Sequence, residues 1–301
     1  MGHNHSHDHS HHTSNTRVLS VSFILIFTFM IVEAIGGFLT NSLALLSDAG
    51  HMLSDAAALG LSLLAFKVGE KKATQDKTYG YRRFEIIAAF INGITLIAIS
   101  IYIFYEAFHR FSDPPTVSAS MMIIAFIGLV VNIIVAWMLM RGDSKENLNI
   151  RSALLHVFGD LLGSVGALIA GILIFLFNWN VADPIASVIV ACLIIISGFR
   201  ITKDAIHILM EGKPDHINMD NIIENLSRLD GVKDVHDLHV WSITSEFPAM
   251  SCHVIVDDTV DRDRLLQKIN EILKVNFNIS HCTIQMEGLN ASIHNESDYC
   301  D

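Results

Sequence analysis

Apolar residues gather in six long blocks over the first two thirds of the chain, and short polar stretches separate them. Each block is long enough to cross a bilayer, because about 20 mostly apolar residues in a helix span the hydrocarbon core. A helix also satisfies its backbone hydrogen bonds internally, as lipid requires. We therefore predict six membrane-spanning helices at residues 18–39, 43–66, 84–108, 117–140, 153–177 and 181–201.

From Pro214 onward the apolar spacing becomes that of short amphipathic elements. Residues 219–229 and 261–275 repeat apolar positions as helices do, whereas 232–243, 249–256 and 282–286 alternate as strands do. The order helix–strand–strand–helix–strand predicts a small α+β domain with its helices on one face of a sheet. A domain this small has a marginal core, which dimerisation would help to stabilise.

Composition and charge support this division. Only 17% of the residues are charged, against about 25% in soluble domains. Of the net charge of −11, −10 falls from Pro214 onward, with 16 acidic and 6 basic residues. This acidic balance excludes a nucleic-acid footprint, so we expect no nucleic-acid partner. The four cysteines are scattered and form no disulfide framework, and the polar N-terminus offers no cleavable signal peptide.

Basic residues give the predicted spans an orientation. Lysine and arginine precede the first block, fill the second and fourth of the five loops, and follow the sixth block, whereas the other loops hold only Arg110. Excess Lys and Arg marks the cytoplasmic side of a membrane. We therefore predict a multi-pass protein of the cell (plasma) membrane with both termini in the cytoplasm.

Two matched His–Asp pairs lie inside the predicted spans. His51 and Asp55 in the second block, and His156 and Asp160 in the fifth, are each four residues apart and share a helix face. Ionisable groups within a span are costly and usually mark a pathway or site. Two His and two Asp suit the tetrahedral ligand set of Zn²⁺. Without metal the same atoms would hold protons, which is a basis for antiport.

Other interpretations of these residues stay open. Either pair could be a hydrogen bond between helices rather than a metal site. Asp48, three residues before His51, is an accessory carboxylate, a proton acceptor or a polar lining residue. We predict that residues 1–16 are disordered, and this tail binds metal through its composition, although an interrupted affinity tag would look similar. Its histidines are His3, His5, His7, His9, His11 and His12.

The predicted C-terminal domain offers a second group of metal-binding side chains. His236 and His239 lie in the segment VHDLHVW, and His253 lies on the next predicted strand. The last strand contributes His281, Cys282 and Glu287. Neighbouring strands could bring these side chains together in a cytoplasmic metal site, although a single histidine is more often an ordinary surface or core residue.

The chain resembles the cation diffusion facilitator family of metal transporters. The resemblance covers nearly the whole chain and is greatest for the bacterial branch that handles zinc, cadmium and cobalt, which is also similar to vesicular zinc transporters. The motifs occur in the family's order: SLALLSDAGHMLSDAAAL, TYGYRRFEIIAAFING, LLHVFGDLLGSVG, VADPIAS and VHDLHVW.

This resemblance implies a homodimer that exports divalent metal from the cytoplasm, driven by protons, and so confers metal tolerance. It implies a six-helix transmembrane domain at 17–208, a ferredoxin-like cytoplasmic domain at 209–290 that binds metal and dimerises, and a tail at 291–301.

The resemblance also assigns site residues. The ligands of the transported metal match His51, Asp55, His156 and Asp160, and the His–Asp pair on the second span matches the zinc-preferring form. His236, His253 and Glu287 match the cytoplasmic metal position, with Zn²⁺ as the expected ligand. The loop 67–83 departs from members with a histidine site there, so we expect no loop site.

Three rival functions remain distinguishable by experiment. A catalytic zinc usually keeps three protein ligands and one open position, so four ligands and no separate general base argue against an intramembrane metalloenzyme. A metal-sensing scaffold would bind metal without flux. Four direct ligands would hold a metal too tightly for fast conduction by a channel. We therefore predict a transporter and not an enzyme.

Overall fold

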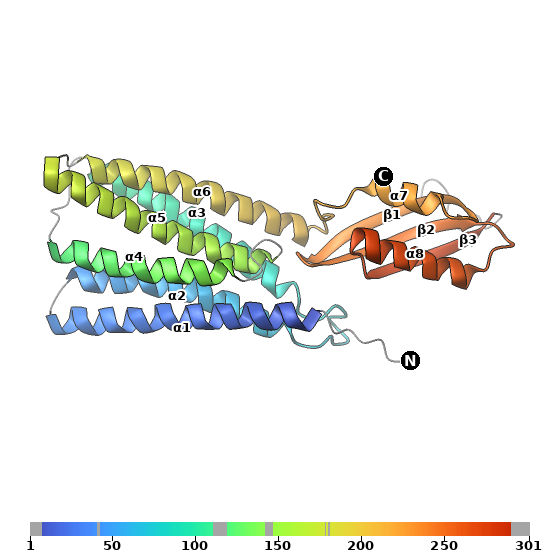
Figure 1. The fold of residues 1–301 in the computed structure, drawn as a ribbon, viewed down its shortest axis with the longest axis horizontal. Helices are drawn as coiled ribbons and strands as arrows, with labels where there is room; N and C mark the ends of the chain where they lie inside the picture. Colours follow the sequence, from blue (N-terminus) through green and yellow to red (C-terminus); the bar gives the residue numbers. More distant parts are fainter. Residues whose placement is uncertain are drawn as a thin grey trace. The chain divides into compact units, whose positions relative to one another are not determined.

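The computed structural model describes residues 8–40, 43–110, 119–141, 147–177, 179 and 181–289, and divides into two units after Ile206. Within the described residues, the first unit is built from six long helices (Figure 1), and each overlaps one predicted apolar block. The helices are α1 Asp8–Thr40, α2 Leu43–Gly69, α3 Phe84–Arg110, α4 Ala119–Met140, α5 Leu148–Phe177 and α6 Ala182–Leu209.

Several helices extend beyond the predicted blocks. Helix α1 begins at Asp8, inside the tail that we expected to be disordered, because no glycine or proline interrupts the chain between His3 and Ile35. Helix α5 begins at Leu148, where the Asn147 side chain accepts a hydrogen bond of 3.1 Å from the Ile150 N–H and so caps the helix. The expected C-terminal tail and residues 1–7 lie outside the described residues.

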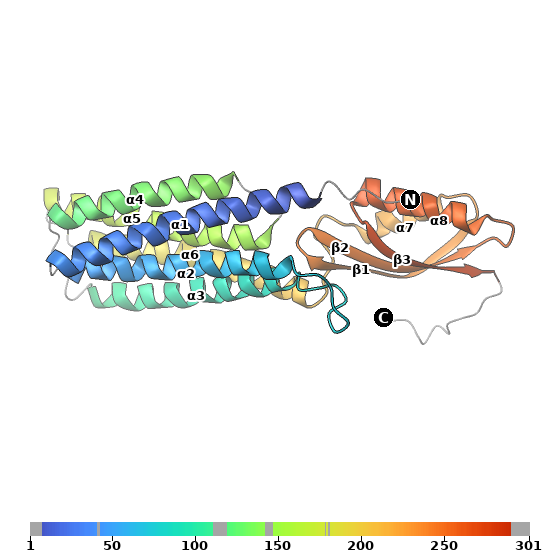
Figure 2. The ribbon, with the colours of Figure 1, turned by 90° about the horizontal axis from the view of Figure 1, so that it is seen from below.

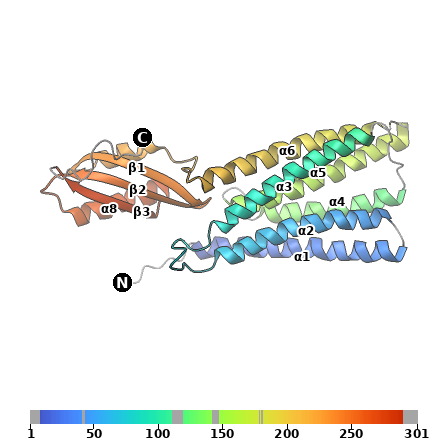
Figure 3. The ribbon, with the colours of Figure 1, turned by 180° about the vertical axis from the view of Figure 1, so that it is seen from behind.

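Two packing arrangements organise the bundle. Helices α1, α2, α4 and α5 share one apolar core, whose fully buried members include Leu19, Leu59, Leu139 and Ile150. Helix α3 packs against α2 and α5 (Figure 3). Helices α3 and α6 approach closely at Gly93 and Gly198, because neither residue has a side chain. A Cβ at Gly198 would lie only 3.0 Å from the carbonyl oxygen of Gly93.

The outer surface of the bundle is apolar. By length and composition, one stretch of the described residues, Phe84–His109, passes as a membrane span, and Thr16–Val32 and Phe126–Met140 are shorter apolar stretches. Large apolar side chains are nevertheless exposed on several helices, including Ile24 on α1, Phe126 on α4 and Phe199 on α6. Soluble monomers rarely expose so much apolar surface, so these faces suit a lipid environment.

The second unit has the predicted order of elements. It contains α7 Met219–Ser227, β1 Val232–Thr244, β2 Phe247–Val256, α8 Arg262–Phe277 and β3 His281–Gly288. The described strands form one sheet in the order β1–β2–β3, with β1 antiparallel and β3 parallel to β2. Figure 2 shows both helices on the same side of this sheet, and the prediction of helices on one face is confirmed.

The core of the second unit lies between the sheet and these helices. Ile222 of α7 and Ile269 of α8 are fully buried against Cys252 and Val254 of β2. Because side chains alternate across a strand, His253 points to the opposite face of the sheet. That opposite face is therefore available for polar chemistry.

Truncation of the buried Ile269 should unfold this unit more easily. We expect Ile269→Ala to lower the free energy of unfolding by about 2–5 kcal/mol, because the deletion leaves a cavity in the core. Val275→Ala is the matched control, since Val275 lies on the same helix and is 73% exposed. Urea unfolding of the full-length protein in detergent, followed by circular dichroism, measures both changes. Equal midpoints for the two variants would contradict the assignment of the core.

Candidate metal centres

Three ionisable side chains meet between α2 and α5 in the first unit. His156 Nε2 lies 3.2 Å from Asp55 Oδ1 and 3.9 Å from Asp160 Oδ2. Asp55 and His156 are buried, and the Asp160 side chain is 17% exposed. One ligand atom from each residue falls within 4.8 Å of the others, close enough for the three to share one metal ion. We call these three residues the α2–α5 cluster.

The sequence places these side chains together through two simple rules. His156 and Asp160 are one helical turn apart on α5, so they share a face, and α2 packs directly against α5. Asp55 therefore faces both of them across the helix interface. Burying these charges alone would be unfavourable, but the opposite charges and a bound cation compensate for each other.

The structure brings together three of the four predicted ligands of this site. His51 lies on α2 one turn before Asp55, and Asp48 precedes it on the same helix. The side chains of both residues lie outside the described part of the structure, so their predicted roles remain predictions.

A buried polar junction lies close to this cluster, and sequence reasoning missed it. The Asn92 side-chain amide on α3 donates to Ser62 Oγ on α2 at 3.2 Å and to Ser152 Oγ on α5 at 3.4 Å. Ser152 is one turn from His156, so the junction ties α3 to the two helices that carry the cluster. Isolated serine and asparagine residues have no spacing pattern that would identify such a junction from the sequence.

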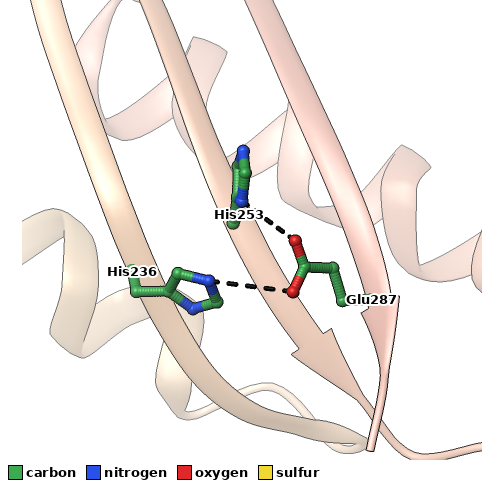
Figure 4. Close-up of side chains that lie close together, drawn as sticks. All are labelled: His236, His253 and Glu287. Atoms are coloured by element: carbon green, nitrogen blue, oxygen red, sulfur yellow. Dashed lines mark ion pairs between the residues drawn. The ribbon is translucent and has the colours of Figure 1, made fainter. Parts of the chain in front are cut away.

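A second group of side chains lies on the open face of the sheet. His236 of β1 is paired in register with His253 of β2, and Glu287 projects from β3 between them (Figure 4). Glu287 Oε1 lies 2.9 Å from His253 Nδ1, and Glu287 Oε2 lies 3.8 Å from His236 Nε2. We call these three residues the sheet cluster. Two imidazoles and a buried carboxylate, with ligand atoms within 4.8 Å of one another, suit Zn²⁺.

The other predicted residues of this domain do not belong to the sheet cluster. Cys282 packs against the core, and its thiol donates to Asn270 Oδ1 at 2.9 Å. The His281 ring lies against Phe247, with ring centroids 5.8 Å apart. His239 is 44% exposed and contacts Asp237 rather than Glu287. The tail histidines lie outside the described residues, either entirely or in their side chains.

Two polar residues beside the sheet cluster were not predicted. Gln285 Nε2 donates to Glu287 Oε1 at 3.0 Å and orients that carboxylate. Asp237 Oδ2 lies 3.7 Å from His253 Nε2, on the side of the ring away from Glu287. Alternation along β3 would have placed Gln285 on the face of Glu287, whereas Asp237 reaches this face through a local irregularity that the sequence does not reveal.

The thiol of Cys252 should react slowly in the folded protein. Burial raises its pKa to about 12, with a further contribution from Cys282 nearby. A pKa of about 12 leaves only about one thiolate in 10⁴ thiols at pH 8, and the thiolate is the reactive form. We expect maleimide at pH 8 to label a protein that retains only Cys252 much more slowly than the same protein in denaturant. Equal labelling rates would show that Cys252 is accessible in the folded state.

Comparison with known proteins assigns both units. Residues 19–210 match the family model described as the cation efflux transmembrane domain, and residues 214–289 match the cytoplasmic domain of cation efflux proteins. The chain belongs to the cation efflux family. Its α2–α5 cluster lies in the family's transmembrane domain and its sheet cluster in the cytoplasmic domain. The resemblance to cation diffusion facilitators is thereby confirmed, and the chain is a membrane protein of a transporter family.

Members of the cation efflux family match this chain over almost its full length. A cadmium, cobalt and zinc/H⁺–K⁺ antiporter of Bacillus subtilis is 56% identical over 95% of this chain and 92% of its own. A zinc transporter, ZitB, of Pectobacterium atrosepticum is 44% identical over 95% of this chain and 89% of its own. The metal-bound C-terminal domain of the CzcD transporter from Cupriavidus metallidurans is 32% identical, covering 24% of this chain and 99% of that domain, with a TM-score of 0.23.

Proposed function

We propose that this protein exports Zn²⁺, together with Cd²⁺ and Co²⁺, from the cytoplasm in exchange for protons. The observation that carries the proposal is the buried α2–α5 cluster inside a cation efflux transmembrane domain. In this proposal, Asp55, His156 and Asp160 hold the transported ion, and His51 supplies the fourth ligand from the preceding turn of α2. The names of the relatives from Bacillus and Pectobacterium support this choice of metals.

The ligand set suits a divalent ion in a dehydrated site. Two carboxylates neutralise the double charge of the metal, and imidazole nitrogens provide donors that Zn²⁺, Cd²⁺ and Co²⁺ all accept. The same oxygen and nitrogen atoms bind protons when the metal leaves. Metal and protons therefore compete for one set of atoms: binding of the metal displaces the protons, and binding of protons displaces the metal.

Transport then requires that the cluster face the two sides of the membrane in turn. When the cluster is open to the cytoplasm, Zn²⁺ displaces protons from Asp55, His156 and Asp160. When it is open to the opposite side, protons return to these side chains and the metal is released. Movement of α2 and α5 as parts of a packed bundle is the general way in which transporters switch exposure.

The proposal includes a topology and an assembly. All six helices α1–α6 span the cell membrane, which their exposed apolar faces support, and both termini lie in the cytoplasm, which the basic loops support. The second unit is a ferredoxin-like cytoplasmic domain through which two copies dimerise. Its sheet cluster of His236, His253 and Glu287 binds Zn²⁺ as a resident ion, with His239 near this site and Asp48 near the transport site as accessory residues.

Flux through purified protein in proteoliposomes tests this function. With an acidic lumen and an alkaline exterior, we expect external Zn²⁺ to enter the lumen while the lumen becomes more alkaline. Collapsing the pH gradient with a protonophore should slow Zn²⁺ entry, and Cd²⁺ and Co²⁺ should compete. A further arm with an imposed K⁺ gradient asks whether K⁺ acts as a second counter-ion.

Each alternative gives a different result. A metal-sensing scaffold would bind Zn²⁺ but give no flux above that of empty liposomes. A channel would carry Zn²⁺ at a rate independent of the pH gradient. Either outcome would overturn proton-coupled export.

A further inference from the structure

The backbone of β1 is irregular next to the sheet cluster. His236 pairs with His253, and His239 pairs with Ser251, so β1 uses three steps where β2 uses two. This extra residue makes a β-bulge, and Asp237 within it has a φ of 47°. A positive φ is uncommon for residues other than glycine, although aspartate is among those that tolerate it. Bulges beside functional sites commonly redirect a side chain.

The bulge changes which face of the sheet these side chains occupy. In a regular strand, Asp237 would point to the face opposite His236, toward the helices and the apolar core. With the bulge, the Asp237 carboxylate reaches the open face, where it lies 2.9 Å from His239 Nε2 and 3.7 Å from His253 Nε2. The same extra residue brings His239 onto the face of His236.

The two nitrogens of His253 therefore meet two different carboxylates. Nδ1 lies 2.9 Å from Glu287 within the sheet cluster, and Nε2 faces Asp237 on the other side of the ring. When one nitrogen of a histidine binds a metal, the other usually donates its N–H to a carboxylate or carbonyl, which fixes the tautomer and the ring orientation. Asp237 occupies the position of that carboxylate.

We propose that Asp237 is a positioning residue for the metal of the sheet cluster, holding the His253 ring so that Nδ1 is directed at the ion. This inference rests on the proposed cytoplasmic zinc site. In the zinc-bound protein, His253 Nε2–H donates to the Asp237 carboxylate, whose Oδ2 lies 3.7 Å away in this structure, and this bond keeps Nδ1 deprotonated and available as a ligand. His239, on the second oxygen of Asp237, holds that carboxylate in turn. The strained backbone at residue 237 serves to place this carboxylate on the open face.

Zinc affinity of the full-length protein tests the proposal. The background carries Asp55→Asn and Asp160→Asn to silence the α2–α5 cluster, and Zn²⁺ is titrated in detergent against a competing chelator. In this background we expect Asp237→Gly to weaken the tightest remaining site about 10- to 100-fold. Asp237→Asn should weaken it less, because the amide oxygen still accepts the N–H of His253. Asp258→Asn, an exposed carboxylate of the same unit, should change nothing.

A second measurement separates positioning from folding. Glycine adopts a positive φ without strain, so Asp237→Gly should not lower the unfolding temperature of the zinc-free protein. In ¹⁵N-histidine spectra of the zinc-loaded protein, His253 should be the Nε2–H tautomer, and this signature should weaken in Asp237→Gly. Zinc affinity of Asp237→Gly within twofold of the background would overturn the proposal. If Glu287→Gln also kept the tight site, the cytoplasmic zinc site itself would be wrong.

Discussion

Replacing Asp55 with asparagine is expected to reduce Zn²⁺ flux in proteoliposomes by about 100-fold or more. Asparagine fills the same space, but it removes the charge that faces His156 at 3.2 Å in a buried setting. Loss of one partner from a buried charged pair costs about 3–5 kcal/mol. An energy of that size, lost from the transition state of transport, corresponds to about two to four powers of ten in rate.

The matched control for this variant is Asp204→Asn on α6. Asp204 pairs with Arg151 at 3.1 Å, but both side chains are about one third exposed, and such pairs contribute little. Asp204→Asn is thus the same chemical change as Asp55→Asn, made in the same helical bundle but at a residue outside the α2–α5 cluster. Flux from Asp55→Asn comparable with that from Asp204→Asn would mean that the ion passes elsewhere.

Glu287→Gln should abolish the stabilisation of the cytoplasmic unit by zinc. Glu287 is the carboxylate that both histidines of the sheet cluster face, and glutamine keeps its shape without its charge. A ligand present at about 100 times its dissociation constant stabilises the folded state by about 2.7 kcal/mol. Urea unfolding of the full-length protein, with and without Zn²⁺, should show that difference in the parent and little of it in the variant.

Glu271→Gln on helix α8 is the control for this second experiment. Glu271 is exposed on the opposite side of the sheet from the cluster, so the zinc-dependent stabilisation should be retained. If Glu287→Gln retained the full stabilisation as well, zinc would be acting through another site.

The sequence was sufficient to predict the elements that carry the α2–α5 cluster. Long apolar blocks located the six helices. The separation of four residues between His156 and Asp160 placed both side chains on one face of α5. The sequence did not predict which helices pack against each other, because the apolar residues of a block are compatible with many different neighbours. The hydrogen bonds from Asn92 to α2 and α5 depend on this helix packing, so the sequence did not predict them either.

The cytoplasmic domain shows a different limit. Alternation along the strands predicted which face His253 would occupy, and family resemblance selected the three residues of the sheet cluster from a longer set of candidates. Alternation failed for Asp237 and His239, because one additional residue in β1 reverses the face of the side chains that follow it, as far as the next register break after Ser242. No local composition distinguishes this bulge from a regular strand.

The irregular backbone of β1 also has a consequence for solubility. Within the described residues β1 is an edge strand, since it pairs with β2 alone. A long, flat edge invites a foreign strand to add to the sheet and is a route to aggregation. The three register breaks along β1 interrupt the row of backbone donors and acceptors that such a strand would need. The distortion next to the metal ligands therefore also guards the domain against uncontrolled strand addition.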